Sequence, residues 1–224
     1  MFKRIPVTVI TGFLGAGKTT LIRNLLINSR KKLAVMVNEF GSVGLDGDLI
    51  RSCDFCPDEE IDGRLVELNN GCLCCTVQDD FLPMMEKLIN TFKDLDGILV
   101  ETSGLALPQP LLDALSWPEI RSNVHINGVV TLTDGLALSN GSPVGDLIAI
   151  NKQRSNDPNL DHMTSINDLY SDQLSSADLV LISRCDLLTR DTIDQITESI
   201  RQKIREGTSI FEISNGLIDS DLIL

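Results

Sequence analysis

Short runs of apolar residues alternate with amphipathic stretches along most of the chain. Runs rich in β-branched residues predict strands at residues 7–11, 33–37, 65–68, 97–101, 127–133, 178–182 and 209–213. Periodic apolar positions predict helices at residues 18–27, 80–92, 111–115, 165–176 and 192–205. Buried strands that alternate with helices are typical of a parallel sheet covered on both faces. The pattern therefore predicts a doubly wound α/β domain with a mostly parallel sheet.

Two segments interrupt this alternation and are expected to be loops. Residues 41–63 are polar and acidic, and residues 137–162 are rich in Asn, Asp, Ser and Pro. The chain has 224 residues, of which 42% are hydrophobic, and this is enough for one large core. We therefore expect one domain over residues 1–224.

The overall charge argues against some partners. The formal net charge is −13 and the sequence pI is near 4.5, so the phosphate backbone of a nucleic acid would be repelled. No apolar run approaches the roughly 20 residues that a membrane helix needs, and the first residues do not resemble a secretory signal. These features predict a cytoplasmic protein that has neither nucleic acid nor a membrane as a partner.

A glycine-rich motif follows the first expected strand and opens the first expected helix. Its sequence, GFLGAGKT, matches the phosphate-loop pattern G-x-x-x-x-G-K-[ST]. In such a loop, backbone N–H groups face phosphate, the lysine reaches the β- and γ-phosphates, and the hydroxyl ligates Mg²⁺. The predicted nucleotide-binding residues here are Gly12, Phe13, Leu14, Gly15, Ala16, Gly17, Lys18, Thr19 and Thr20.

An acidic residue ends the apolar strand at residues 97–101. We expect Glu101 to bind or orient Mg²⁺ beside Thr19, and Gly104 to donate its backbone N–H to the γ-phosphate. Taken alone, the segment could be an ordinary strand end with an exposed carboxylate. The neighbouring phosphate loop favours the magnesium role.

Base recognition is expected from the sequence SRCD at residues 183–186. Guanine sites commonly use Asn-Lys-x-Asp, in which the Asp accepts from the ring N–H and the exocyclic amine. Asp186 retains this acceptor, and the stem of Arg184 can stack on the base. Ser183 lacks the Asn side chain that cross-links this turn to the phosphate loop, which predicts weaker affinity or relaxed base choice. In the alternative interpretation, Asp186 only caps the following helix.

Three of the six cysteines lie within four positions, in the sequence NNGCLCC. Cys72 and Cys74 share one face of an extended segment, and Cys75 can approach from a turn. Three thiolates leave one tetrahedral position open, which suits a metal carrier, and they favour Zn²⁺, Co²⁺ or Cu⁺ over Mg²⁺. A structural zinc site completed by Cys53 or Cys56 is the alternative.

Together these motifs resemble the CobW family of P-loop GTPases and metallochaperones. The resemblance rests on GFLGAGKT, residues 38–41, Glu67 upstream of GCLCC, ETSGLALP and residues 173–187, and it covers essentially the whole chain. The segment CDFCPDEE, with residues 117–122 and 127–130, resembles the branch of cobalamin biosynthesis more than the zinc-handling relatives.

The resemblance implies a SIMIBI-like GTPase domain in which residues 38–41 form the first switch. Glu39 then joins Lys18 and Glu101 as a candidate catalytic residue. The resemblance also implies Mg²⁺ with GTP as cofactor and Co²⁺ or Zn²⁺ as cargo at residues 72–75. A metal-accepting protein, with a cobalt chelatase expected, would receive the cargo. The C-terminal domain that family members usually carry is not expected within residues 1–224.

The predicted mechanism links the two sites. A γ-phosphate would order residues 38–41 and 101–104, and this ordering would bring the cysteine turn into a binding geometry. Slow hydrolysis is expected because no arginine finger is evident. Three alternatives stay open: a zinc metallochaperone without a cobalt role, a nucleotide-binding module in which zinc staples a loop, and an ATP-dependent small-molecule kinase.

Overall fold

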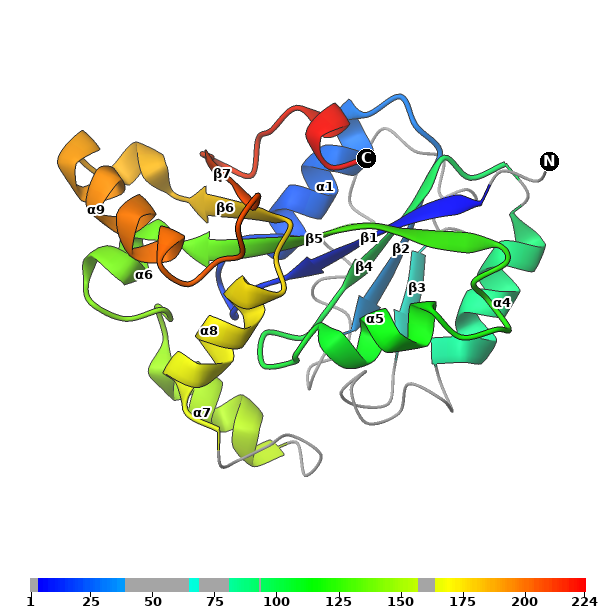
Figure 1. Cartoon of the computed structure of the whole chain (residues 1–224), viewed down its shortest axis with the longest axis horizontal. Coiled ribbons are helices and arrows are strands. Elements are labelled where there is room, and N and C mark those ends of the chain that lie inside the picture. The colour runs from blue at the N-terminus through cyan, green and yellow to red at the C-terminus, as the bar shows by residue number, and fades with distance from the viewer. Residues whose placement is uncertain (1–3, 39–64, 69–80, 93, 157–163) are drawn as a thin grey trace.

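A parallel sheet forms the centre of the described part of the chain (Figure 1). The computed structural model describes residues 4–38, 65–68, 81–92, 94–156 and 164–224. Within these ranges the sheet has seven strands in the order β3-β2-β4-β1-β5-β6-β7, and each neighbouring pair is parallel. The strands are β1 (Ile5–Thr11), β2 (Leu33–Asn38), β3 (Leu65–Leu68), β4 (Gly97–Glu101), β5 (Val124–Asp134), β6 (Leu179–Ser183) and β7 (Ser209–Glu212).

Helices cover both faces of this sheet (Figure 1). The described helices are α1 (Lys18–Asn28), α4 (Leu82–Thr91), α5 (Gln109–Leu115), α6 (Gly135–Ser139), α7 (Leu147–Asn156), α8 (Ile166–Ser175) and α9 (Arg190–Arg201), with 3-10 turns η2 (Cys185–Leu187) and η3 (Ser220–Leu222). Alternate residues of each strand enter different cores. Ala34 and Met36 of β2 pack with α4 and α5, whereas Val35 and Val37 pack with α1. The predicted doubly wound α/β fold is confirmed.

The expected loop at residues 137–162 is wrong over much of its length. Helices α6 and α7 occupy residues 135–139 and 147–156, while residues 157–163 and the other expected loop at 41–63 lie outside the described residues. Local capping explains the difference. Asp146 Oδ1 accepts from the Ala149 N–H at 2.9 Å at the start of α7, and Ile150 is buried against α8 and β6. The polar composition of this segment therefore led to the prediction of a loop, although α7 is a helix with a cap and a buried apolar residue.

The sheet brings chemically important residues to one edge. All seven strands run in the same direction, so the segments that follow β1, β4, β6 and β7 emerge together at the carboxyl edge. Open parallel sheets bind ligands in this position. No helix in the described ranges has the length and apolar character needed to cross a membrane.

Candidate nucleotide-binding site

The phosphate loop depends on glycines in the left-handed region. Gly12 has φ 133°, and a Cβ there would lie 2.2 Å from the backbone oxygen of Leu132 in β5. Gly17 has φ 103° and is the N-cap of α1, where no described side chain forms a cap hydrogen bond. The backbone N–H groups at the start of α1 therefore suit an anion, because the helix dipole and the N–H groups of the first turn act together.

Three side chains meet beside this loop. Lys18 is 7% exposed, and its Nζ donates to the backbone oxygens of Gly12 at 2.9 Å and Phe13 at 3.2 Å. The buried carboxylate of Glu101 has Oε1 at 3.9 Å from Lys18 Nζ and accepts from Thr19 Oγ1 at 3.5 Å. A hydroxyl and a carboxylate so close together supply the oxygen ligands that Mg²⁺ prefers. The pair therefore fits the expected Mg²⁺ of a bound nucleotide.

The segment after β4 packs directly on the phosphate loop. A Cβ at Gly104 would lie 2.6 Å from the backbone nitrogen of Leu14, so only glycine allows this approach. The buried side chain of Gln173 in α8 donates through Nε2 to the backbone oxygens of Gly104 and Ala106, both at 3.3 Å. Gln173 therefore holds the segment that carries the expected γ-phosphate donor.

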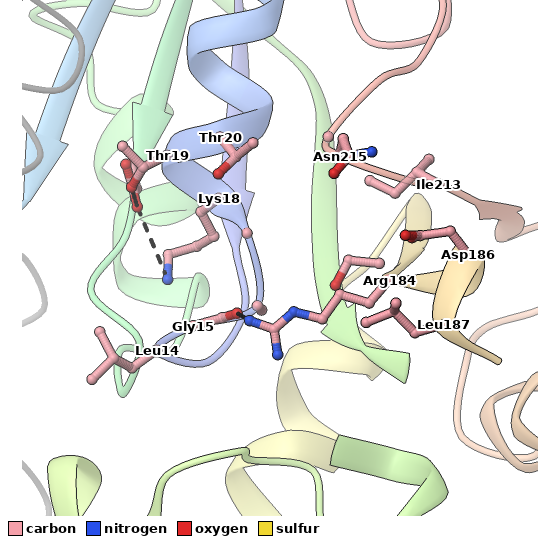
Figure 2. Close-up of a pocket in the computed structure, with 15 residues that line it drawn as sticks. Leu14, Gly15, Lys18, Thr19, Thr20, Arg184, Asp186, Leu187, Ile213 and Asn215 are labelled. Atoms are coloured by element: carbon pink, nitrogen blue, oxygen red, sulfur yellow. Dashed lines mark hydrogen bonds and ion pairs between the residues drawn. The ribbon is translucent and has the colours of Figure 1, made fainter. Parts of the chain in front are cut away.

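A cavity of about 740 Å³ extends from the phosphate loop to the turns after β6 and β7. Figure 2 shows Lys18 and Thr19 on one side of it and Asp186, Ile213 and Asn215 on the other. Its lining consists of Leu14, Gly15, Ala16, Gly17, Lys18, Thr19, Thr20, Glu101, Ser183, Arg184, Asp186, Leu187, Ile213, Asn215 and Gly216. The structure thus brings residues 14–20 of the phosphate loop, Glu101, and the predicted base residues Arg184 and Asp186 around one cavity, whereas the predicted γ-phosphate donor Gly104 is not among the lining residues.

Two predicted residues of the phosphate loop lie outside this lining. Gly12 and Phe13 contribute their carbonyl groups to Lys18 instead. The Phe13 ring is 3% exposed and lies 6.3 Å from the ring of Tyr170 in α8. The ring of Phe13 therefore anchors the loop to the core, and the contact of Phe13 with nucleotide stays a prediction.

The turn after β7 was not predicted as part of the site. Asn215 and Gly216 both have positive φ, at 52° and 67°, and Asn24 Nδ2 donates to the Asn215 oxygen at 2.7 Å. A Cβ at Gly216 would lie 3.0 Å from the backbone nitrogen of Leu21. The Asn-Gly pair was the available sequence signal, because this pair is typical of a tight turn.

Arg184 makes the cross-link that Ser183 was expected to lose. Ser183 Oγ donates to the Thr133 oxygen at 3.2 Å, so it ties β6 to β5. The guanidinium of Arg184 donates through Nη2 to the Gly15 oxygen at 3.2 Å and through Nη1 to Asp134 Oδ2 at 2.7 Å. The base-side turn and the phosphate loop are therefore connected, and Asp134 is a further residue that the sequence analysis missed.

Burial keeps two nearby groups protonated. It raises the pKa of Tyr170 to about 12, despite the opposing hydrogen bond with Thr133. Burial also raises the pKa of the Cys185 thiol, which donates to the Ile182 oxygen at 3.1 Å. Metal binding requires the thiolate, so Cys185 is poorly suited to be a ligand.

The predicted cargo site falls on residues that the structure leaves out. Cys72, Cys74 and Cys75 lie outside the described residues, as do Glu39 and the pair Cys53 and Cys56. Within the described ranges, no three His, Cys, Asp or Glu side chains are grouped so as to hold a metal ion. The cysteine roles and the role of Glu39 stay predictions.

The strand that precedes the cysteines is nevertheless placed. β3 pairs with β2, and the register aligns Glu67 with Val37, which is aligned in turn with Glu101 of β4. Two strand spacings separate β3 from β4, or about 10 Å. The carboxyl end of β3, which precedes Cys72 in the sequence, therefore lies at the same edge of the sheet as the phosphate loop.

Comparison with known proteins gives concordant matches. The model of the CobW/HypB/UreG nucleotide-binding domain matches residues 6–212. The chain is 44% identical over 223 residues to the zinc chaperone CobW of Pseudomonas aeruginosa, covering 99% of this chain and 60% of that relative. It is 35% identical over 219 residues to zinc-regulated GTPase metalloprotein activator 1 of Schizosaccharomyces pombe, covering 96% and 47%. The chain thus spans 47% to 60% of the length of these two relatives.

Solved structures share the fold. Zn(II)-bound YjiA GTPase from E. coli aligns with a TM-score of 0.59 at 19% identity, covering 99% of this chain and 61% of that chain. HypB from Helicobacter pylori, in complex with nickel, aligns with a TM-score of 0.56 at 16% identity, covering 98% and 82%. The motifs, the parallel sheet and the match over residues 6–212 agree, and the chain belongs to the CobW/HypB/UreG family.

Proposed function

We propose that this chain is a cytoplasmic metallochaperone domain that binds GTP with Mg²⁺, hydrolyses GTP slowly, and carries Zn²⁺ or Co²⁺ to a metal-accepting protein. One observation carries the proposal. The carboxyl edge of a single parallel sheet holds the cavity lined by Lys18 and Thr19, and the strand that leads to Cys72 ends at the same edge. The zinc-related names of the two relatives support a metal as the cargo.

Each nucleotide-binding residue has a role that its surroundings support. Lys18 exchanges its bonds to two backbone oxygens for bonds to the β- and γ-phosphates. Thr19 and Glu101 hold Mg²⁺, which when bound supplies charge neutralisation for the phosphate oxygens. Gly104 donates its N–H to the γ-phosphate, and Glu39 orders the attacking water.

Asp186 makes guanine the preferred base. Its carboxylate lines the base side of the cavity and can accept only, whereas adenine presents a ring acceptor at the matching position. The stem of Arg184 stacks on the base while its guanidinium remains bonded to Asp134 and Gly15. A small-molecule kinase using ATP would not be expected to place a carboxylate acceptor there.

Nucleotide and cargo affect each other through the edge of the sheet. The γ-phosphate orders the segments after β2 and β4. In the sheet, β2 is the neighbour of β3, the strand that leads to Cys72, Cys74 and Cys75, and β4 is the next strand beyond β2. If GTP raises metal affinity by some factor, metal must raise GTP affinity by the same factor. Hydrolysis then lowers both affinities and releases the metal.

Zinc is the first cargo to test. Zn²⁺ outranks Co²⁺ at most nitrogen, oxygen and sulfur sites, and both relatives carry zinc in their names. If Co²⁺ is the cargo, a cobalt chelatase is the recipient that the resemblance to the branch of cobalamin biosynthesis implies. Residues 1–224 form the nucleotide-binding unit, and the recipient docks on this unit or on regions that the longer relatives possess.

Metal titration in three nucleotide states tests the proposal. Zn²⁺ and Co²⁺ are titrated against a chromophoric chelator with the chain bound to a non-hydrolysable GTP analogue and Mg²⁺, to GDP and Mg²⁺, or to no nucleotide. We expect metal affinity with the analogue to be about tenfold higher or more. Cys74→Ser should remove the difference. Equal affinities in the three states would reject the coupling, and a chelator-sensitive stability without coupling would indicate a zinc-stapled module.

A further inference from the structure

We propose that Asp134 is a positioning residue for base recognition, which acts by fixing Arg184 between the base-side turn and the phosphate loop. The proposal rests on the proposed binding of guanine nucleotides. Asp134 does not line the cavity itself, so its effect must pass through Arg184. No motif in the sequence marked this residue.

The carboxylate of Asp134 is held in one orientation. Asp134 is the last residue of β5 and is 4% exposed. Its Oδ1 accepts from the N–H groups of Leu136 at 3.0 Å and Ala137 at 3.3 Å, which caps α6. Its Oδ2 faces Arg184 Nη1 at 2.7 Å. Because each oxygen has a separate partner, the carboxylate presents a fixed acceptor to the guanidinium.

Arg184 uses its second terminal nitrogen on the phosphate loop. Nη2 donates to the Gly15 oxygen at 3.2 Å, and Figure 2 shows the guanidinium reaching toward Gly15. A planar guanidinium can satisfy two acceptors in fixed directions, which a lysine ammonium cannot do in the same way. The contacts join the end of β5, the turn at η2 and the phosphate loop.

The side-chain contacts of Arg184 also bear on its backbone conformation. Arg184 has φ 58° and ψ 29°, a left-handed conformation that residues other than glycine rarely adopt. Asp186 follows two positions later and lines the cavity. The bonds to Asp134 and Gly15 therefore stabilise the turn in the conformation that presents the Asp186 carboxylate to the base.

The charge of Asp134 alone would have the opposite effect. Removing a carboxylate close to the phosphate loop makes the cavity more positive, and this should tighten the binding of every nucleotide. Positioning, in contrast, predicts weaker binding that is confined to guanine nucleotides. The sign and the base dependence of the change separate the two explanations.

The test compares GTP and ATP affinity in Asp134→Asn, Arg184→Met and the double variant of the full chain. Asparagine keeps an oxygen that can cap α6, and methionine keeps the apolar stem of Arg184. We expect each single variant to bind GTP about tenfold more weakly, the double variant to lose little more, and ATP affinity to stay unchanged. Competition against a fluorescent GDP derivative measures all of these affinities.

Arg190→Met is the matched control. Arg190 forms ion pairs at 2.8 Å with Asp194 and Glu212 close to the same turn, but it is not among the residues that line the cavity. Its replacement should leave both affinities unchanged. Thermal unfolding of each variant checks that the fold is retained. The side chain of Arg184 is 45% exposed, so we expect Arg184→Met to fold even if Asp134→Asn does not.

Three results would overturn the inference. Wild-type GTP affinity in Asp134→Asn would remove the role of Asp134, and tighter binding of GTP and ATP alike would show that only charge matters. Additive losses in the double variant would mean that Asp134 and Arg184 act separately. Failure of the wild-type chain to bind GTP would reject the proposed function itself, and it is recognised before any variant is compared.

Discussion

The phosphate side and the base side of the cavity are built in different ways. The phosphate side comes from residues 14–20 and from Glu101 of the neighbouring strand β4. The base side comes from the turns at residues 183–187 and 213–216, which Arg184 and Asn24 hold through hydrogen bonds. Backbone conformation at glycines therefore dominates one side, and hydrogen bonds from side chains to distant segments dominate the other. Substitutions on the phosphate side and on the base side should therefore differ in their effects on stability and on nucleotide affinity.

Gly12→Ala should cause the largest loss of stability, about 3 to 5 kcal/mol in the free energy of unfolding. Residue 12 has φ 133°, and the new Cβ would lie 2.2 Å from the Leu132 oxygen. Denaturant unfolding measures the loss. Gly141→Ala is the control because its φ is 81° and its Cβ would meet nothing within 4 Å, so only strain of about 1 to 2 kcal/mol is expected. Equal losses would mean that β5 moves aside at little cost.

Lys18→Met should weaken GTP binding about 100-fold while leaving the base side intact. The substitution removes a buried ammonium that lies 3.9 Å from Glu101 and donates to two backbone oxygens of the loop. Fluorescence competition measures the change. Lys31→Met is the control, since Lys31 bonds to the Leu224 oxygen and pairs with Asp221 away from the cavity. A matching loss in both variants would point to a general charge effect.

Tyr170 should make stability fall in alkaline solution. Burial raises its pKa from 10.0 to about 12, so the folded protein keeps the phenol proton that the unfolded chain releases. The stabilisation is complete below pH 10.0 and is lost as pH rises from there toward about 12. The full effect is about 2 to 3 kcal/mol.

Tyr170→Phe should remove this pH dependence, which unfolding in urea at several pH values measures. Tyr170 is the one tyrosine of the chain, so phenolate absorbance reports its pKa directly. An ordinary pKa in the folded protein would show that the ring, which lies behind Phe13 of the phosphate loop, is accessible to water.

Gln173→Leu should have a smaller effect of about 1 to 2 kcal/mol on unfolding. The change leaves the Gly104 and Ala106 oxygens without their donor. It also removes Gln173 Oε1, which has no hydrogen-bond partner among the described residues, so part of the loss is offset. Ser171→Ala, on the exposed side of α8, should change stability by less than about 0.5 kcal/mol. An unchanged stability in Gln173→Leu would show that the segment after β4 is held by the phosphate loop alone.

Local composition predicted the strands well and the helices less well. Residues 97–101 form a strand with the expected bounds, because four apolar or small residues in a row, followed by Glu101, identify a central strand. Residues 147–156 were expected to be a loop because the segment is polar. They form α7 instead, and the helix contributes the buried Ile150 to the core. Composition cannot reveal a helix whose stability comes from one cap and one buried contact.

The sequence by itself determined the parallel α/β fold and the phosphate loop. These features depend on hydrophobic periodicity and on glycines within short stretches, so short segments of the sequence are enough to predict them. Only the tertiary structure decided how the base side is held. Asp134, Arg184 and Gly15 come from three separate segments, and their contacts exist because β5, β6 and β1 end at the same edge of the sheet. Contacts between such distant residues leave no local pattern, because the fold has to bring them together first.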